Sequence, residues 1–271
     1  MPDTPRPPAA GRPSPAPPGR LALALHRTAT LTGRRIRISR RDIDAIITAL
    51  LLPLMLMLVF IYFFGGAIDT GTAYVTYVVP GILVLCASFG ASTTAVGVSE
   101  DMKSGIIDRF RSLDVGGTPV LTGHVVASAL RNILSTALVL TVSLLIGFRP
   151  AASAADWLAA GGLLLFFVVA VSWLSAALGL LARSPEVAGG FTFFMTFLPY
   201  PSSAFVKIET MPDWLHAFAG NQPVTPLIES LRGLLLDQPV GNAPWIALAW
   251  CGGLTLLGVA ASGPLFRLRT R

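Results

Sequence analysis

The sequence predicts an all-α integral membrane protein with six transmembrane helices. The chain of 271 residues is 53% hydrophobic and only 13% charged, and its mean hydropathy is +0.69. Soluble domains are nearer a quarter charged. The apolar residues also gather in six runs, each near the length of about 20 helical residues that crosses a hydrocarbon core of about 30 Å.

The six runs cover residues 46–64, 74–98, 122–147, 157–182, 187–206 and 244–264. The fifth run contains Pro199 and Pro201, which break or end helices, so it predicts either a full span or a short one that leads into a re-entrant segment. We expect four regions: a disordered proline-rich tail (1–20), an amphipathic interfacial segment (21–45), the six-span domain (46–266) and a basic tail (267–271). The short apolar stretch after residue 20 is unlike a signal peptide, so we expect no cleaved leader.

The distribution of cations predicts the orientation of these spans. Sixteen of the 20 Lys and Arg residues fall in the amino-terminal region, the loops after the second and fourth runs and the carboxyl-terminal tail. The alternate loops hold Arg149, Lys207 and Arg232, while Arg131 lies within the third run and is expected to extend toward the interface. Because cations favour the cytoplasmic side, both termini are expected there.

The segment SEDMKSGIIDRFRSL, residues 99–113, is unusually charged for this chain. Met102, Ile106, Phe110 and Leu113 recur at steps of four, four and three, which predicts an amphipathic helix outside the membrane core. Such a helix lies either on lipid headgroups or in a groove of a partner protein. Its mixture of acids and bases favours the protein partner.

Two further segments predict interfacial structure. Residues 32–44, TGRRIRISRRDID, suit either contact with anionic lipid or a plain topology anchor, and their alternating isoleucines leave a strand open as well as a helix. Between the fifth and sixth runs, Thr210 and Thr225 resemble helix caps and Gly220 a stop, which predicts two short helices dipping toward the membrane. These helices either gate an exit path or simply cap the bundle.

The sequence argues against catalysis in this chain. It contains no P-loop motif, and Cys86 and Cys251 lie within apolar runs, as expected of buried small hydrophobes. The three histidines, His26, His124 and His216, are far apart and are expected at interfaces or in loops. We therefore expect no catalytic residue, no cofactor and no metal site, and the scattered cations argue against nucleic-acid binding.

Several motifs, in this order, resemble one known family. They are YVTYVVPGIL with Pro80 and Gly81, then Gly97, Glu100, Asp101, Gly105, Arg109 and Arg111, then GFRP, then ARSPEVAG, and last the stretch from Phe205 through Met211, Pro212, Trp214, Pro223 and Thr225 to Arg232. Over about residues 30–265 the chain resembles the membrane subunit of type-2 ABC exporters, most closely the permeases of the daunorubicin-resistance type.

The resemblance implies a permease subunit of the bacterial cytoplasmic membrane that exports a hydrophobic or amphipathic small molecule, such as a drug or antibiotic. It implies a homodimer bound to two copies of a separate ABC ATPase that supplies the energy. It also implies an amphipathic elbow before the first span, external re-entrant helices, and a coupling role for residues 99–113. The expected ATPase-coupling residues are Glu100, Asp101, Met102, Lys103, Gly105, Ile106, Arg109, Phe110 and Arg111, with the apolar ones filling a groove in the ATPase and the charged ones setting the register.

Three alternatives stay open from the sequence. Permeases with the same six-span architecture also export lipids or glycans, so the substrate could belong to either class. A membrane protein whose amphipathic helix recruits a partner other than an ATPase has the same composition. A membrane-embedded enzyme acting on lipid would need a cluster of nucleophiles, carboxylates or metal ligands, which the sequence does not offer.

Overall fold

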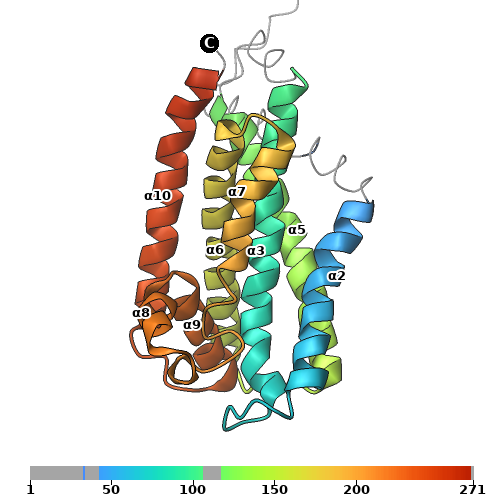
Figure 1. Ribbon diagram of the computed structural model, residues 1–271, viewed down its shortest axis with the longest axis vertical. Coiled ribbons are helices and arrows are strands. Elements are labelled where there is room, and N and C mark those ends of the chain that lie inside the picture. Colours follow the sequence, from blue (N-terminus) through green and yellow to red (C-terminus); the bar gives the residue numbers. More distant parts are fainter. Residues whose placement is uncertain (1–32, 34–42, 106–116, 270–271) are drawn as a thin grey trace, which may run out of the picture.

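The computed structural model describes residues 43–105 and 117–269, together with Gly33, and every regular element within them is helical. The helices form one bundle, with α8 and α9 at one end and the carboxyl end of α10 at the other (Figure 1). We call these the α9 end and the α10 end. The elements are α2 (Ile43–Val59), η1 (Phe60–Phe64), α3 (Tyr74–Lys103), α5 (Gly117–Ile146), α6 (Ala154–Leu181), α7 (Pro185–Phe197), η2 (Ile208–Thr210), α8 (Asp213–Asn221), α9 (Val224–Leu236) and α10 (Ala243–Arg269).

Helix α3 lies at the centre of the bundle and packs on α2, α5, α6, α7 and α9. Small residues permit its closest contacts. A Cβ added to Gly179 of α6 would lie 2.5 Å from the Ala95 carbonyl oxygen of α3, and one added to Gly258 of α10 would lie 2.7 Å from the Trp173 backbone of α6. In a membrane the hydrophobic effect does not drive helices together, because lipid tails are as apolar as the side chains. Helices there associate through close packing, which small residues allow.

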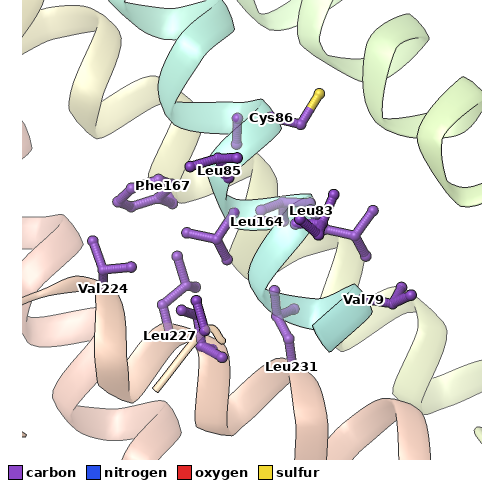
Figure 2. Packing of buried hydrophobic residues seen from close by; sticks show 14 of the residues in the cluster. Val79, Leu83, Leu85, Cys86, Leu164, Phe167, Val224, Leu227 and Leu231 are labelled. Atoms are coloured by element: carbon purple, nitrogen blue, oxygen red, sulfur yellow. The ribbon is translucent and has the colours of Figure 1, made fainter. Parts of the chain in front are cut away.

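The main hydrophobic cluster joins α3, α6 and α9 toward the α9 end. Figure 2 shows side chains from these three helices meeting, with Leu83 beside Leu164 and with Leu227 and Leu231 approaching from α9. These residues are nearly or fully inaccessible. The short helix α9 is thereby fixed to the long helices rather than resting loosely on them.

The all-helical prediction is confirmed, whereas the count of six spans is only partly matched. Four helices, α3, α5, α6 and α10, are long and apolar enough to cross a membrane. Helix α7 has 13 residues and is about 20 Å long, which is short of the hydrocarbon thickness. The length of α7 therefore does not support a full span over the fifth run. In the first run, the apolar helix over Leu51–Phe64 is also short.

The two short helices predicted between the fifth and sixth runs are present as α8 and α9. Their predicted caps are wrong, because α8 begins after Pro212 and α9 after Pro223, neither with a side-chain cap. Thr210 instead donates to the Lys207 carbonyl, and Thr225 lies inside α9 and donates to the Ala219 carbonyl. Proline occupies the N-cap position of both helices, where it offers no side-chain hydroxyl.

The expected tail and interfacial segment lie outside the described residues, apart from Gly33 and the backbone at the start of α2. Two residues of the expected basic tail, Arg267 and Arg269, lie in the last turn of α10. Helix α10 continues to Arg269, whose Nη2 donates to the Ala182 carbonyl at the end of α6 at 2.6 Å. A cation bound to a helix C-terminus in this way satisfies a free carbonyl and the helix dipole.

Candidate functional site

The carboxyl end of α3 carries the first of the expected coupling residues. The prediction of one helix over 99–113 is wrong at its start, because Ser99–Lys103 belong to α3, which ends at Lys103 with Ser104 as its C-cap. Gly105 then takes φ +69, a left-handed conformation that favours glycine and redirects the chain. The other expected coupling residues, Ile106, Arg109, Phe110 and Arg111, lie outside the described residues.

The expected coupling residues at this end face in different directions. Glu100 and Lys103 are exposed, whereas Asp101 is buried. Met102 is half-buried and packs with Val98 and neighbouring side chains of α5, α6 and α10 rather than projecting from the molecule. The exposed surface here is therefore charged, and the apolar side chain stabilises the bundle.

Asp101 forms a buried pair with His124 of α5. Oδ2 of Asp101 lies 3.0 Å from Nε2 of His124, and each side chain is 6% exposed. Of the two positions expected for His124, the structure excludes a loop, since this residue lies inside α5 and is buried. Separating a buried pair of this kind leaves a polar group without compensation, so it ties α3 firmly to α5.

The pair begins a polar stripe along one face of α5. Its members are His124, Ser128, Arg131 and Asn132, at the i, i+4, i+7, i+8 spacing of a single helical face. Ser128 accepts from Ser172 of α6 at 2.9 Å, and Arg131 Nη2 donates to Thr93 Oγ1 of α3 at 2.9 Å. The spacing was visible in the sequence, and it is the signal by which this stripe could have been found.

Helix α7 begins beside this end. Pro185 occupies its first turn, and the Ser184 hydroxyl caps it by accepting from the Val187 amide. Glu186 lies in the first turn of α7, where the helix dipole favours an acidic side chain.

At the α9 end the central feature is Arg232. This side chain was predicted only as a cation of an external loop, yet it is 7% exposed. Its guanidinium donates to Glu229 Oε1 at 2.7 Å, to the Ser203 carbonyl at 2.8 Å and to the Tyr77 carbonyl at 3.2 Å. It also lies 3.8 Å from the centre of the Tyr77 ring, a cation–π contact. One residue thus joins α3, α9 and the connection after α7.

The same connection holds α3 at two further points. The Tyr74 hydroxyl donates to the Phe205 carbonyl at 3.0 Å. A Cβ on Gly81 would lie 2.7 Å from Cα of Ala204, so only glycine permits this contact. A polar cavity of about 450 Å³ beside Arg232 is lined in part by Lys207, Glu209 and Glu229. The YVTYVVPGIL motif and the motif around Phe205 therefore meet in space.

Residues 26–236 of the chain match the family model described as ABC-2 type transporter. The chain belongs to this family. It is 32% identical over 192 residues to the daunorubicin resistance ABC transporter permease protein DrrB1 of Streptomyces coeruleorubidus, covering 70% of this chain and 68% of that protein. It is 23% identical over 237 residues to the probable doxorubicin resistance ABC transporter permease protein DrrC of Mycobacterium tuberculosis, covering 87% and 86%.

The resemblance inferred from the motifs is confirmed. The protein is an ABC-2 permease homologous to drug-resistance ABC transporter permease subunits, and its apolar helices agree with a protein of the bacterial inner membrane. An ABC-2 permease works with an ABC ATPase subunit. Within residues 43–105 and 117–269 no group of three or more His, Cys, Asp or Glu is placed to hold a metal ion.

Proposed function

We propose that this chain is the membrane subunit of an ATP-driven drug exporter that moves a hydrophobic or amphipathic small molecule outward. Two copies form the path, and two copies of a separate ATPase dock on the α10 end. This end is cytoplasmic, as the cation distribution favours, so both termini and the segment after α3 face the ATPase. The relatives' names, which refer to daunorubicin and doxorubicin, support this class of substrate.

The observation that carries the proposal is the continuity of α3. This helix of 30 residues runs from the Arg232 contacts at one end to the exposed charges of Glu100 and Lys103 at the other. Buried polar bonds hold both ends, and α3 packs along its length on α6. A push on its carboxyl end would therefore move α9 and the connection after α7, which suits them to gate the external side.

Residues 99–113 couple the permease to the ATPase, and different residues of this segment have different roles. Glu100, Lys103, Arg109 and Arg111 contact the ATPase, Ile106 and Phe110 fill its groove, and Gly105 sets the angle between α3 and the segment. Asp101 and Met102 transmit the movement inward, because their side chains face α5 and the cluster around Val98.

Six spans complete the proposed topology, with α2 and η1 as the first and α7 as a short fifth. An amphipathic elbow precedes α2, and α8 and α9 are the external re-entrant helices. In η1 the chain continues α2 with five π-helical residues, and the Phe60 ring stacks on the Phe205 ring at 4.1 Å between centres. The first span thereby reaches the same connection that Arg232 holds.

The test replaces residues 106–113 with a Gly-Ser linker and leaves Ser99–Lys103 intact, because those residues belong to α3. The chain is co-expressed with candidate ATPases, purified in detergent, and assayed in inside-out vesicles for ATP-dependent doxorubicin uptake. We expect the wild type to retain an ATPase and accumulate doxorubicin, and the linker variant to lose both.

Charge reversal supplies the matched control. The double variant Arg109→Glu with Arg111→Glu should lose doxorubicin uptake. The variant Arg149→Glu should keep it, because Arg149 is exposed at the opposite end of the bundle. An ATPase that still binds the linker variant would refute the docking site. A wild-type complex that hydrolyses ATP without accumulating doxorubicin would refute drug export.

A further inference from the structure

The polar cavity of about 450 Å³ at the α9 end lies between the loop before α3, the connection after α7 and α9. Its volume is within the range of about 300–1,000 Å³ that is typical of small-molecule sites. Four charged side chains line it, namely Lys207, Glu209, Glu229 and Arg232. Two of them are cations and two are anions, so the lining favours a ligand that carries both charges over one with a large net charge.

Two of these charges are paired within the protein and two are not. Arg232 donates to Glu229 Oε1 at 2.7 Å and to two backbone carbonyls. Lys207 and Glu209 are exposed, and within the described part of the chain neither side chain has an ion-pair or hydrogen-bond partner. They lie two residues apart on the same connection, with opposite charges that do not bond to each other. Both groups are therefore available to a ligand.

The free ammonium and the free carboxylate belong to a cavity with further polar groups. A Cβ added to Gly71 would lie 3.7 Å from Lys207 Nζ, so the lysine side chain reaches the loop before α3. Thr70 and Thr72 of that loop also line the cavity. The Glu229 side chain is 43% exposed, and only its Oε1 atom is bonded to Arg232, which leaves Oε2 as a second acceptor.

Aromatic side chains indicate that this end of the bundle lies at a membrane–water interface. Tyr62 of η1, Trp214 of α8 and Trp245 in the first turn of α10 are all exposed. Helix α8 and the first turn of α10 lie at the α9 end (Figure 1), and η1 leads into the loop that lines the cavity. Exposed Tyr and Trp gather where lipid headgroups meet the apolar core. A lipid headgroup is therefore a polar ligand that is present next to this cavity.

We propose that this cavity binds the headgroup of phosphatidylethanolamine, with the phosphate accepting from Lys207 and the ammonium donating to Glu209. Both are charge-assisted hydrogen bonds, and Glu229 Oε2 offers the ammonium a second acceptor. An anionic headgroup would satisfy Lys207 and leave Glu209 without a partner. A choline headgroup carries the positive charge but has no N–H to donate. The site does not depend on which molecule the protein exports.

The test measures lipid binding to the full chain by native mass spectrometry after release from detergent micelles. Dioleoyl phosphatidylethanolamine, phosphatidylcholine and phosphatidylglycerol are titrated separately, so that only the headgroup differs. Glu209→Gln removes the carboxylate at nearly the same size, and Lys207→Gln removes the cation. Asp213→Asn and Arg149→Gln are the matched controls, because both residues are exposed charges at the same end and neither lines the cavity. Substitutions at exposed positions should leave the fold intact.

We expect the wild type to bind phosphatidylethanolamine with a Kd at least about fivefold below that for phosphatidylcholine, because only the former donates hydrogen bonds to the carboxylates. Glu209→Gln should reduce this preference to less than about twofold. Lys207→Gln should raise the Kd for both lipids about threefold and keep the preference, since both lipids carry the phosphate. The two control variants should match the wild type.

Equal affinity of the wild type for phosphatidylethanolamine and phosphatidylcholine would overturn the site, as would a preference that Glu209→Gln keeps. Tighter binding of phosphatidylglycerol than of phosphatidylethanolamine would show a surface for anionic lipid and would also overturn it. Glycerophosphoethanolamine, which is the same headgroup without acyl chains, separates a membrane ligand from a dissolved one. It should bind at least about tenfold more weakly than the lipid, because it gains no apolar contact, and equal binding would overturn the lipid as the ligand.

Discussion

Replacing Arg232 with Met should destabilise the protein strongly. The substitution keeps most of the aliphatic volume and removes the guanidinium that bonds the Tyr77 and Ser203 carbonyls and lies over the Tyr77 ring. A hydrogen bond from a charged group contributes about 1.5–3 kcal/mol, and a desolvated cation–π contact about 2 kcal/mol. Release of the charge from its buried site offsets part of this, which leaves a net loss of about 3–5 kcal/mol.

The partner carboxylate should matter much less. The Glu229 side chain is 43% exposed, so solvent screens its bond to Arg232 and its contribution is at most about 1 kcal/mol. Glu229→Gln should therefore lower stability only slightly. The two variants together test whether the buried carbonyls, rather than the visible ion pair, hold this site.

The assay is thermal unfolding in detergent followed by a maleimide dye. Cys86 and Cys251 are 1% and 2% exposed and not disulfide-bonded, so both thiols become reactive only when the helices separate. At one fixed scan rate we expect Arg232→Met to lower the apparent midpoint by roughly 10 °C, since 1 kcal/mol corresponds to about 2–4 °C for a chain of this size. Arg149→Met, an exposed arginine bonded to the Leu144 and Phe148 carbonyls, should shift it by about 2 °C. Equal shifts for the two arginines would refute the reasoning.

Two more outcomes follow from the contacts of α3. A double-mutant cycle of Asp101→Asn and His124→Phe, read as unfolding free energy, should give a coupling of at least about 1 kcal/mol, and additive effects would show that the two side chains do not stabilise one another. Gly81→Ala should destabilise by about 1–3 kcal/mol because its Cβ meets the Ala204 backbone, whereas Gly189→Ala, with no atom within 4 Å, should be neutral or stabilising; a stable Gly81→Ala protein would remove the close contact from the account.

The long helices were predictable because they depend on composition over many residues. A run such as 157–182 has few ways to satisfy its backbone in an apolar phase other than as a helix, and α6 occupies Ala154–Leu181. Helix ends were less predictable. The charges of Glu100, Asp101 and Lys103 suggested a new element outside the membrane. Charge does not end a helix, however, and α3 continues to Lys103, shortly before Gly105 takes its left-handed conformation.

The polar contacts show a similar limit. Asp101 and His124 are 23 residues apart on different helices, and no motif around either residue predicts that they pair. The count of cations assigned Arg232 to an external loop, because such a count does not show that α9 packs against α3 and α6. The stripe on α5 was readable from its spacing alone, so polar residues at helical period within an apolar run deserve more weight than their number suggests.

The arrangement of polar bonds explains why α3, rather than α5 or α10, is suited to carry movement between the two ends. Helices α5 and α10 leave most of their surface uncovered, as expected of faces that meet lipid or a second subunit. Helix α3 is covered on nearly all sides, and backbone contact at Ala95 with Gly179 and at Gly81 with Ala204 leaves little room for it to bend independently. Because Asp101 anchors its carboxyl end and the Arg232 contacts anchor its amino end, a displacement at one end must either move the other or break a buried polar bond. Moving the whole helix with α6 and α9 costs less, and that is the movement that the proposed exporter requires.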